Sequence, residues 1–137
     1  LDPSEPTPLD QIYISDFSSR SISDEQDLDV IAPGSWIVGP YQLNSGNKTS
    51  YYFLGGTSMA APHVAGIVAL MLEKNPTLSA SDAEDILEVA AIPLAPGSKQ
   101  VFNPSLRVWE EISWGDDATG HGFITADAAL AGTPLVP

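Results

Sequence analysis

A serine stands where a polar turn runs into the most apolar segment of the chain. The stretch reads Gly55-Gly56-Thr57-Ser58-Met59-Ala60-Ala61-Pro62-His63-Val64-Ala65-Gly66. Its glycines allow a tight turn or a close approach to a ligand, and Thr57 can cap the following helix. Ser58 then falls in the first helical turn, where unpaired N–H groups and the helix dipole favour negative charge. The pattern predicts a nucleophile beside an oxyanion site; a capped helix without catalytic ancestry is the alternative.

Two histidines are candidate bases for this serine. His63 lies five residues beyond Ser58, so on a helix it points about 140° away and lies about 7.5 Å further along the axis. A packing role is therefore predicted for His63. His121 follows Asp116 and Asp117 in a glycine-rich segment, and the order serine, acid, histidine occurs in unrelated hydrolases. A small serine hydrolase using Ser58, His121 and Asp117 is one alternative, although an acid so close to its histidine is weakly positioned.

A pair of aspartates suggests a cation site. Asp27 and Asp29 are spaced by two, which places both carboxylates on one side of a strand. Carboxylate oxygens suit calcium and other hard cations, so the pair is a candidate structural site; two solvated carboxylates at a strand start are the alternative. No cofactor is predicted for catalysis itself.

The composition indicates a folded, acidic domain. The 137 residues are 43% hydrophobic and 17% charged, which permits a real core. A net charge of −13 argues against nucleic acid or an anionic membrane as a partner. The longest apolar run, residues 64–72, is too short to span a bilayer. Because cysteine is absent, disulfides and thiol chemistry are excluded. No signal peptide is visible.

Local patterns predict short strands and helices around these residues. Residues 1–11 are proline-rich and are expected to form an extended lead-in. Strands are predicted at residues 11–20, 28–34 (closed by a Pro-Gly turn) and 51–54. A helix predicted over residues 58–74 has no polar face through its middle, so it should be enclosed by other elements.

The C-terminal half carries further helix signals. A capping box beginning at Ser81 predicts a second helix through Ala90 or Ala91. Residues 92–114 mix aromatic side chains with prolines and glycines, which suggests irregular strands or an insertion. Thr125 is expected to cap a last short helix, and residues 132–137 are expected to form a loose tail. Asn47 begins a glycosylation sequon in a polar loop.

The serine-bearing stretch resembles the nucleophile motif of the subtilisin-like serine proteases (subtilases), Gly-Thr-Ser-Met-Ala-(Ala/Ser/Thr)-Pro-His-Val-Ala-Gly. Other segments are similar to subtilase segments in the family order: Asp16-Phe17-Ser18-Ser19-Arg20, Leu28-Asp29-Val30-Ile31-Ala32-Pro33-Gly34 and the ending from Gly120 to Leu130. The resemblance covers about residues 14–131 and corresponds to the C-terminal part of the catalytic domain. It implies an α/β, subtilisin-like three-layer sandwich, of which residues 1–137 form the C-terminal segment with a buried central helix starting at the nucleophile.

The resemblance also implies a function. A subtilase segment would take part in peptide-bond hydrolysis by acyl transfer through Ser58, with Thr57, Gly56 and Gly55 beside the oxyanion or substrate. Gly55 stands where the family commonly has asparagine. In the family a catalytic aspartate, a histidine and an oxyanion asparagine precede the serine, but no histidine precedes Ser58. The expected partner is therefore an upstream segment that supplies these groups, and the chain by itself is predicted to be inactive.

The family implies a polypeptide substrate and a secreted or extracellular location. Asp29 matches the aspartate of a family strand where some members bind calcium or an alkali-metal ion nearby. A non-catalytic, subtilase-derived binding or assembly module is the remaining alternative.

Overall fold

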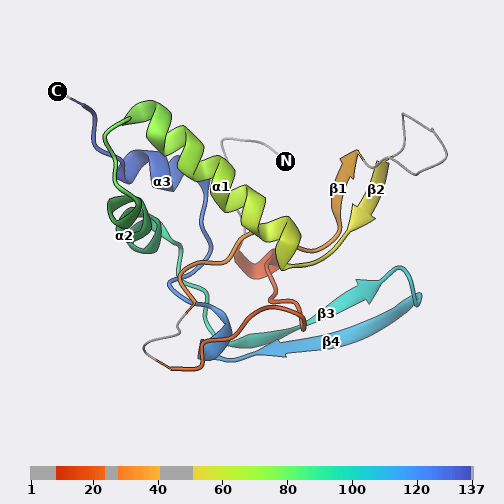
Figure 1. Cartoon of the computed structure of the whole chain (residues 1–137). Helices are drawn as coiled ribbons and strands as arrows, with labels where there is room; N and C mark the ends of the chain where they lie inside the picture. The colour runs from red at the N-terminus through yellow and green to blue at the C-terminus, as the bar shows by residue number, and fades with distance from the viewer. Residues whose placement is uncertain (1–8, 24–27, 41–50, 137) are drawn as a thin grey trace.

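The computed structural model describes residues 9–23, 28–40 and 51–136. Its elements are, in order, η1 (Leu9–Gln11), β1 (Ile37–Pro40), β2 (Tyr51–Leu54), α1 (Thr57–Lys74), α2 (Ala80–Ala90), β3 (Gly97–Asn103), β4 (Val108–Trp114), η2 (Asp116–Ala118) and α3 (Ala126–Gly132). Figure 1 shows α1 running from the β1–β2 pair to α2 and α3. The β3–β4 hairpin lies below α1 in this view. The mixture of helices and strands confirms the α/β class.

The main core lies among the three α-helices. Its buried side chains come from α1, α2 and α3 and from the segment before α3: Ile67, Met71, Ala83, Leu87, Ile124 and Ala129. Met71 and Ala129 have no exposed surface. Burial of these apolar groups is the main contribution that fixes α1 against its neighbours.

Helix α1 buries only one face. Ile67 and Met71 are its buried residues, whereas Leu70 and Leu72 are 43% and 41% exposed. The described part of the chain therefore encloses the helix only in part, because α2 and α3 cover only one side of α1. The sheets formed by the described residues are two separate two-stranded antiparallel pairs, so the parallel layer of a three-layer sandwich is not formed among them.

The helix caps differ in part from the predictions. Helix α1 is capped by Gly56 without a side-chain hydrogen bond, so the prediction that Thr57 is the cap is wrong. Ser79 caps α2 and forms the capping box with Asp82, which corrects the box predicted at Ser81. The box at Ser79 begins the helix earlier because it satisfies two backbone N–H groups.

Thr125 caps α3 as predicted: its hydroxyl accepts a hydrogen bond from the Ala128 N–H. The Thr125 side chain and the Ala128 N–H also lower the pKa of the Asp127 carboxyl below its usual value. The predicted loose tail is wrong at its start, because Gly132 ends α3 and Thr133 is 1% exposed. The Thr133 hydroxyl donates to the Ala129 carbonyl at 2.8 Å, which anchors this end of the chain.

Residues 92–114 contain a regular hairpin where irregular strands were expected. Strands β3 and β4 pair from Gly97 with Trp114 to Asn103 with Val108. At the turn the Asn103 side chain accepts hydrogen bonds from the N–H groups of Ser105 and Leu106, each at 3.1 Å. These bonds organise the turn, so the proline and glycine signals lie at the ends of a ladder and do not interrupt it.

Two predicted strands are not formed. The strand predicted at residues 11–20 is absent, because residue 11 ends a short 3-10 helix (Leu9–Gln11) and residues 12–20 contain no strand. The same short helix contradicts the extended lead-in at residues 9–11. Within 28–34, Ile31 makes only an isolated parallel bridge to Phe123. A strand requires a neighbour that pairs over several residues, and among the described residues these segments have no such ladder beyond the single Ile31–Phe123 bridge. Asp27, Asn47 and residues 1–8 lie outside the described residues, whereas β2 confirms the strand at residues 51–54.

Candidate active site

The turn that carries Ser58 is built on two glycines. Gly56 has φ 154° and ψ 162°, a region essentially restricted to glycine. Its N–H donates to the Gly34 carbonyl at 2.8 Å. A Cβ on Gly34 would lie 3.0 Å from the Gly56 carbonyl oxygen, so glycine at position 34 permits this close approach. The Pro33-Gly34 turn therefore fixes where α1 starts and where Ser58 stands.

Ser58 is the second residue of α1, and it is exposed. Within the part of the chain that the structure describes, its hydroxyl has no hydrogen-bond partner, and no group accepts from the N–H of Thr57 or Ser58. The Met59 N–H bonds back to the Gly56 carbonyl at 3.0 Å. The first turn of α1 contains no acidic residue. A free hydroxyl thus stands beside unpaired donors at the positive end of a helix, an arrangement that can stabilise an oxyanion.

Neither histidine contacts Ser58. The His63 ring hydrogen-bonds through Nδ1 to the Met59 carbonyl at 2.7 Å, which requires a proton on Nδ1. Because His63 is exposed, its predicted packing role is not met in this chain. The His121 Nε2 lies 3.6 Å from a carboxylate oxygen of Glu88. The backbone N–H of His121 donates to the backbone carbonyl of Asp29 at 2.8 Å.

The structure gives no support to the alternative triad. Among residues 9–23, 28–40 and 51–136, no hydrogen bond or ion pair joins Ser58, His121 and Asp117. Gly120, at φ 52°, holds the backbone before His121 directly against the carbonyl of Leu28. This packing directs the His121 ring towards Glu88 on α2.

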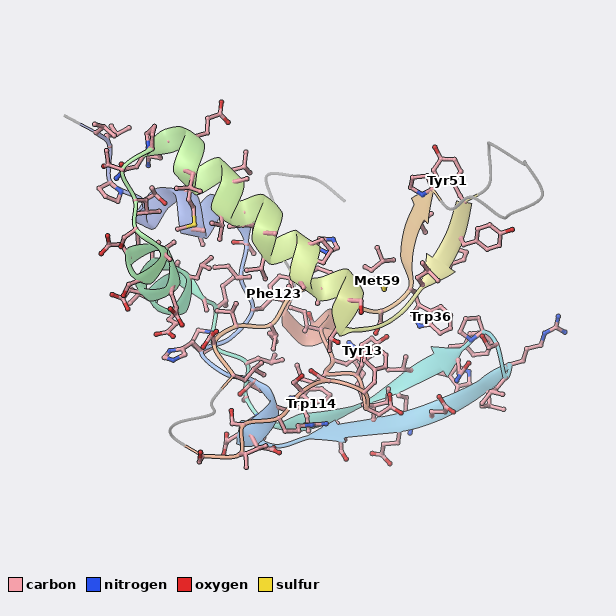
Figure 2. The ribbon with its side chains drawn as sticks, viewed as in Figure 1. Tyr13, Trp36, Tyr51, Met59, Trp114 and Phe123 are labelled. Carbon is pink, nitrogen blue, oxygen red and sulfur yellow. The ribbon has the colours of Figure 1, made fainter. Side chains whose placement is uncertain are left out.

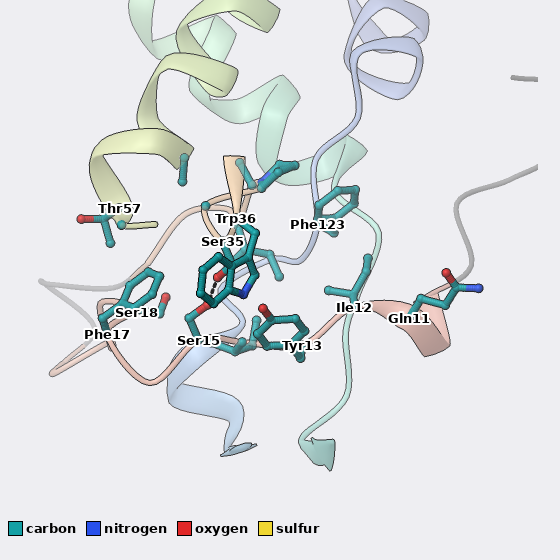
Figure 3. Close-up of a pocket in the computed structure, with 17 residues that line it drawn as sticks. Gln11, Ile12, Tyr13, Ser15, Phe17, Ser18, Ser35, Trp36, Thr57 and Phe123 are labelled. Carbon is teal, nitrogen blue, oxygen red and sulfur yellow. Dashed lines mark hydrogen bonds between the residues drawn. The ribbon is translucent and has the colours of Figure 1, made fainter. Parts of the chain in front are cut away.

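A hollow of about 360 Å³ opens beside the start of α1. Its lining comes from residues 11–15, 17, 18 and 31–36 and from Gly56, Thr57, Ala60 and Phe123. Figure 3 shows the Tyr13 and Trp36 rings next to each other in this hollow, with Phe17 near Thr57. The hydroxyls of Ser15 and Ser35 hydrogen-bond across it at 2.5 Å. The candidate nucleophile turn therefore borders a largely aromatic and apolar recess, which suits binding of side chains.

The candidate cation site gains two residues that sequence reasoning missed. The carboxylates of Asp29, Glu84 and Glu88 offer oxygen atoms within 4.8 Å of one another. Oxygens at this spacing fit the coordination shell of a hard cation such as calcium. Glu84 and Glu88 are four residues apart on α2 and share a face, which is visible in the sequence. Their approach to Asp29 is not visible there, because it depends on how α2 packs.

Comparisons with known proteins agree with the serine motif. The model of the subtilase family (Peptidase_S8) matches residues 10–122. Subtilisin DY of Bacillus licheniformis is 48% identical over 65 residues, which are 47% of this chain and 22% of that protein. Fervidolysin of Fervidobacterium pennivorans is 33% identical over 132 residues, 87% of this chain and 16% of that protein. A protein of Xanthomonas campestris pv. campestris named "Extracellular protease" is 39% identical over 108 residues, covering 75% of this chain and 15% of its own length.

A solved structure supports the fold relationship. The crystal structure of fervidolysin, described as a keratinolytic enzyme related to subtilisin, matches 86% of this chain and 16% of its own at 33% identity and a TM-score of 0.58. The chain thus spans only 15% to 22% of the length of these curated relatives. None of the described helices has both the length and the hydropathy of a membrane span.

Proposed function

The chain belongs to the subtilase family, and we propose that residues 1–137 are the C-terminal segment of a serine endopeptidase domain with Ser58 as nucleophile. One observation carries the proposal. Ser58 stands exposed at the second position of α1, and no described residue forms a hydrogen bond with its hydroxyl or with the N–H groups of Thr57 and Ser58. The family's relatives include serine proteases, so the substrate proposed here is a polypeptide.

The geometry suits acyl transfer. The Ser58 oxygen would attack a peptide carbonyl, and the Ser58 N–H would stabilise the resulting oxyanion, assisted by the Thr57 hydroxyl. Gly55 and Gly56 keep side chains away from this position. The leaving amine would depart with a proton, and water would then release the acyl group from the serine.

The proton from Ser58 requires a base, and none of the described residues forms a hydrogen bond with its hydroxyl. We therefore assign the catalytic histidine, its aspartate and an oxyanion asparagine to an upstream segment that completes the domain. This segment is the proposed partner. Because one relative is named an extracellular protease, a secreted location is proposed for the complete enzyme.

A structural cation is also proposed, with calcium or an alkali-metal ion as candidates. Asp29 would bind it together with Glu84 and Glu88, whose carboxylate oxygens lie within 4.8 Å of one another. Asp27 remains a proposed ligand, although it lies outside the described residues. Bound cation would offset the mutual repulsion of these acidic groups and so stabilise the contact of α2 with residues 28–31.

A fluorophosphonate probe tests the assignment of the nucleophile. In the complete protein it should label Ser58, because such probes react with an activated serine, and Ser58→Ala should abolish the labelling. Ser81→Ala is the matched control, since Ser81 is also exposed near the start of a helix. In this variant the probe should label Ser58 as in the unaltered protein. Peptide mapping identifies the modified residue. Labelling of another serine would overturn the assignment of Ser58 as nucleophile, and labelling of none would favour a non-catalytic module.

A further inference from the structure

A second hollow of about 800 Å³ separates the β3–β4 hairpin from the segment before β1. It includes Gly55, three residues before Ser58. Figure 2 shows Tyr13 and Trp36 between the start of α1 and this hairpin. We call this space the hairpin groove. One wall is formed by residues 13, 15–17, 20, 35, 36 and 55, and the other by residues 101–103, 106 and 110–113. The groove therefore reaches the turn that carries the proposed nucleophile.

The two walls have different chemistry. Along the hairpin, every second residue is partly buried, so Val101, Glu110 and Ile112 share the inner face. Phe102 and Trp109 lie opposite each other in the hairpin with their ring centroids 5.5 Å apart, and Phe102 also lines the groove. The opposite wall contributes the aromatic side chains of Tyr13, Phe17 and Trp36. A bound peptide would thus contact rings on one side and, on the other, a strand face that mixes apolar and polar side chains and includes Glu110.

Glu110 supplies a negative charge that forms no ion pair with any cation in the described part of the chain. It is partly buried on β4, and its carboxylate accepts a hydrogen bond from the Asn103 amide at 2.9 Å. Asp16 and Glu111 also line the groove, and Arg20 is the only cation among the described residues that line it. No ion pair joins Arg20 to any of these acids within the described part of the chain. The groove therefore has an excess of unpaired negative charge, which is complementary to a basic ligand.

Trp36 adds an independent indication. Its φ is 56°, a left-handed conformation that is a genuine outlier for a bulky residue. Its side chain is 40% exposed and lines both hollows. Strained residues of this kind cluster at ligand-binding positions, where the surrounding structure over-determines them. The strain holds an aromatic surface at the junction between the nucleophile turn and the groove.

We propose that the hairpin groove binds an extended segment of the polypeptide substrate whose lysine or arginine side chain pairs with Glu110. The neighbouring rings of Tyr13, Phe17 and Trp36 would pack on the apolar part of the same segment. The inference rests on the proposed function, because the groove gains its meaning as a substrate site from its continuity with the Ser58 turn. It adds a preference for basic substrates that the β3–β4 hairpin determines.

The test measures binding in the complete protein carrying Ser58→Ala, so that no probe is cleaved. Two fluorescein-labelled hexapeptides are compared. Both consist of alanine except for one phenylalanine and the residue that follows it, which is lysine in one peptide and glutamate in the other. Fluorescence anisotropy should give about tenfold tighter binding of the lysine peptide. Glu110→Gln should remove most of this preference, and Glu110→Lys should reverse it. Glu73→Gln, the same charge change at the far end of α1, is the control and should retain the preference.

The reversal guards against a trivial loss of folding, because a misfolded Glu110→Lys variant cannot gain affinity for the glutamate peptide. Equal affinities for the two peptides, an unchanged preference in Glu110→Lys, or no saturable binding would each overturn the inference. The proposed function fails separately: absent fluorophosphonate labelling of Ser58, with the lysine preference intact, would contradict the nucleophile and leave the groove standing.

Discussion

At the scale of single residues, the backbone of two glycines decides where the candidate nucleophile stands. Gly56 has a conformation that other residues rarely adopt, and Gly34 lets two backbone segments approach. The Gly56 N–H bond to the Gly34 carbonyl then joins the turn to a segment about twenty residues earlier. Ser58 needs no side-chain bond of its own to be positioned, and its hydroxyl remains available for chemistry.

Asp29 carries a prediction about cation binding. Calcium or potassium should raise the Tm of the complete protein by mass action, since a ligand at about 100 times its Kd stabilises by about 2.7 kcal/mol. Asp29→Asn should remove most of this rise, because one of three clustered carboxylates is lost. Thermal unfolding with chelator and with each ion provides the measurement. Asp16→Asn, the same change at an exposed acid outside the cluster, should leave the rise intact; an unaltered rise in Asp29→Asn would exclude Asp29 from the site.

At the scale of elements, α2 and α3 are fixed by local caps and a shared core. Ser79 and Asp82 form a reciprocal box at the start of α2, and Thr125 caps α3. Buried Leu87 and Ala129 then belong to the same core cluster as Met71 of α1. The caps satisfy N–H groups that would otherwise have no partner, while apolar burial supplies the greater part of the stabilisation.

A pair of serine substitutions tests which residue caps α2. Ser79→Ala should lower the free energy of unfolding by about 1 kcal/mol, because the Asp82 N–H loses its acceptor. Ser81→Ala, an exposed serine inside the first turn, should change it by less than about 0.5 kcal/mol. Urea unfolding followed by circular dichroism compares the two. A larger loss for Ser81→Ala would place the cap at Ser81 after all.

At the scale of the whole molecule, apolar surface is left open at the side of α1 that α2 and α3 do not cover. Leu70 and Leu72 on α1 are exposed, and every residue of β2 is exposed, including Tyr51 and Phe53. Surface of this kind marks an interaction site in a protein that otherwise carries a net charge of −13. The proposed upstream segment would cover it and supply the missing base, which explains both features together.

Residues 1–137 alone are therefore expected to show no measurable peptidase activity and to self-associate. Without a base Ser58 is a weak nucleophile, and loss of the histidine alone lowers kcat of subtilisin by about six orders of magnitude. Hydrolysis of a chromogenic peptide, with Ser58→Ala as the blank, and size-exclusion chromatography are the measurements. Adding the upstream segment should restore turnover and a discrete size. Serine-dependent turnover by the lone chain would refute the prediction and direct attention back to His121.

Local pattern determined the elements whose hydrogen bonds are local. The predicted helix covers residues 58–74. The observed helix ends at the same residue, Lys74, and begins one residue earlier, at Thr57. The cap at Thr125 was also predictable. Helices and caps satisfy backbone groups within a few residues, so a short stretch of sequence contains the information that forms them.

Only the tertiary structure decided the pairings between distant segments. Phe123 bridges both Ile31 and Ile92, and the carboxylate of Asp29 meets those of two glutamates on α2. The hairpin groove likewise joins residues 13–20 to residues 101–113. Each of these depends on chain segments whose approach is set by packing of the core and by closure of long loops, and no local periodicity encodes that approach.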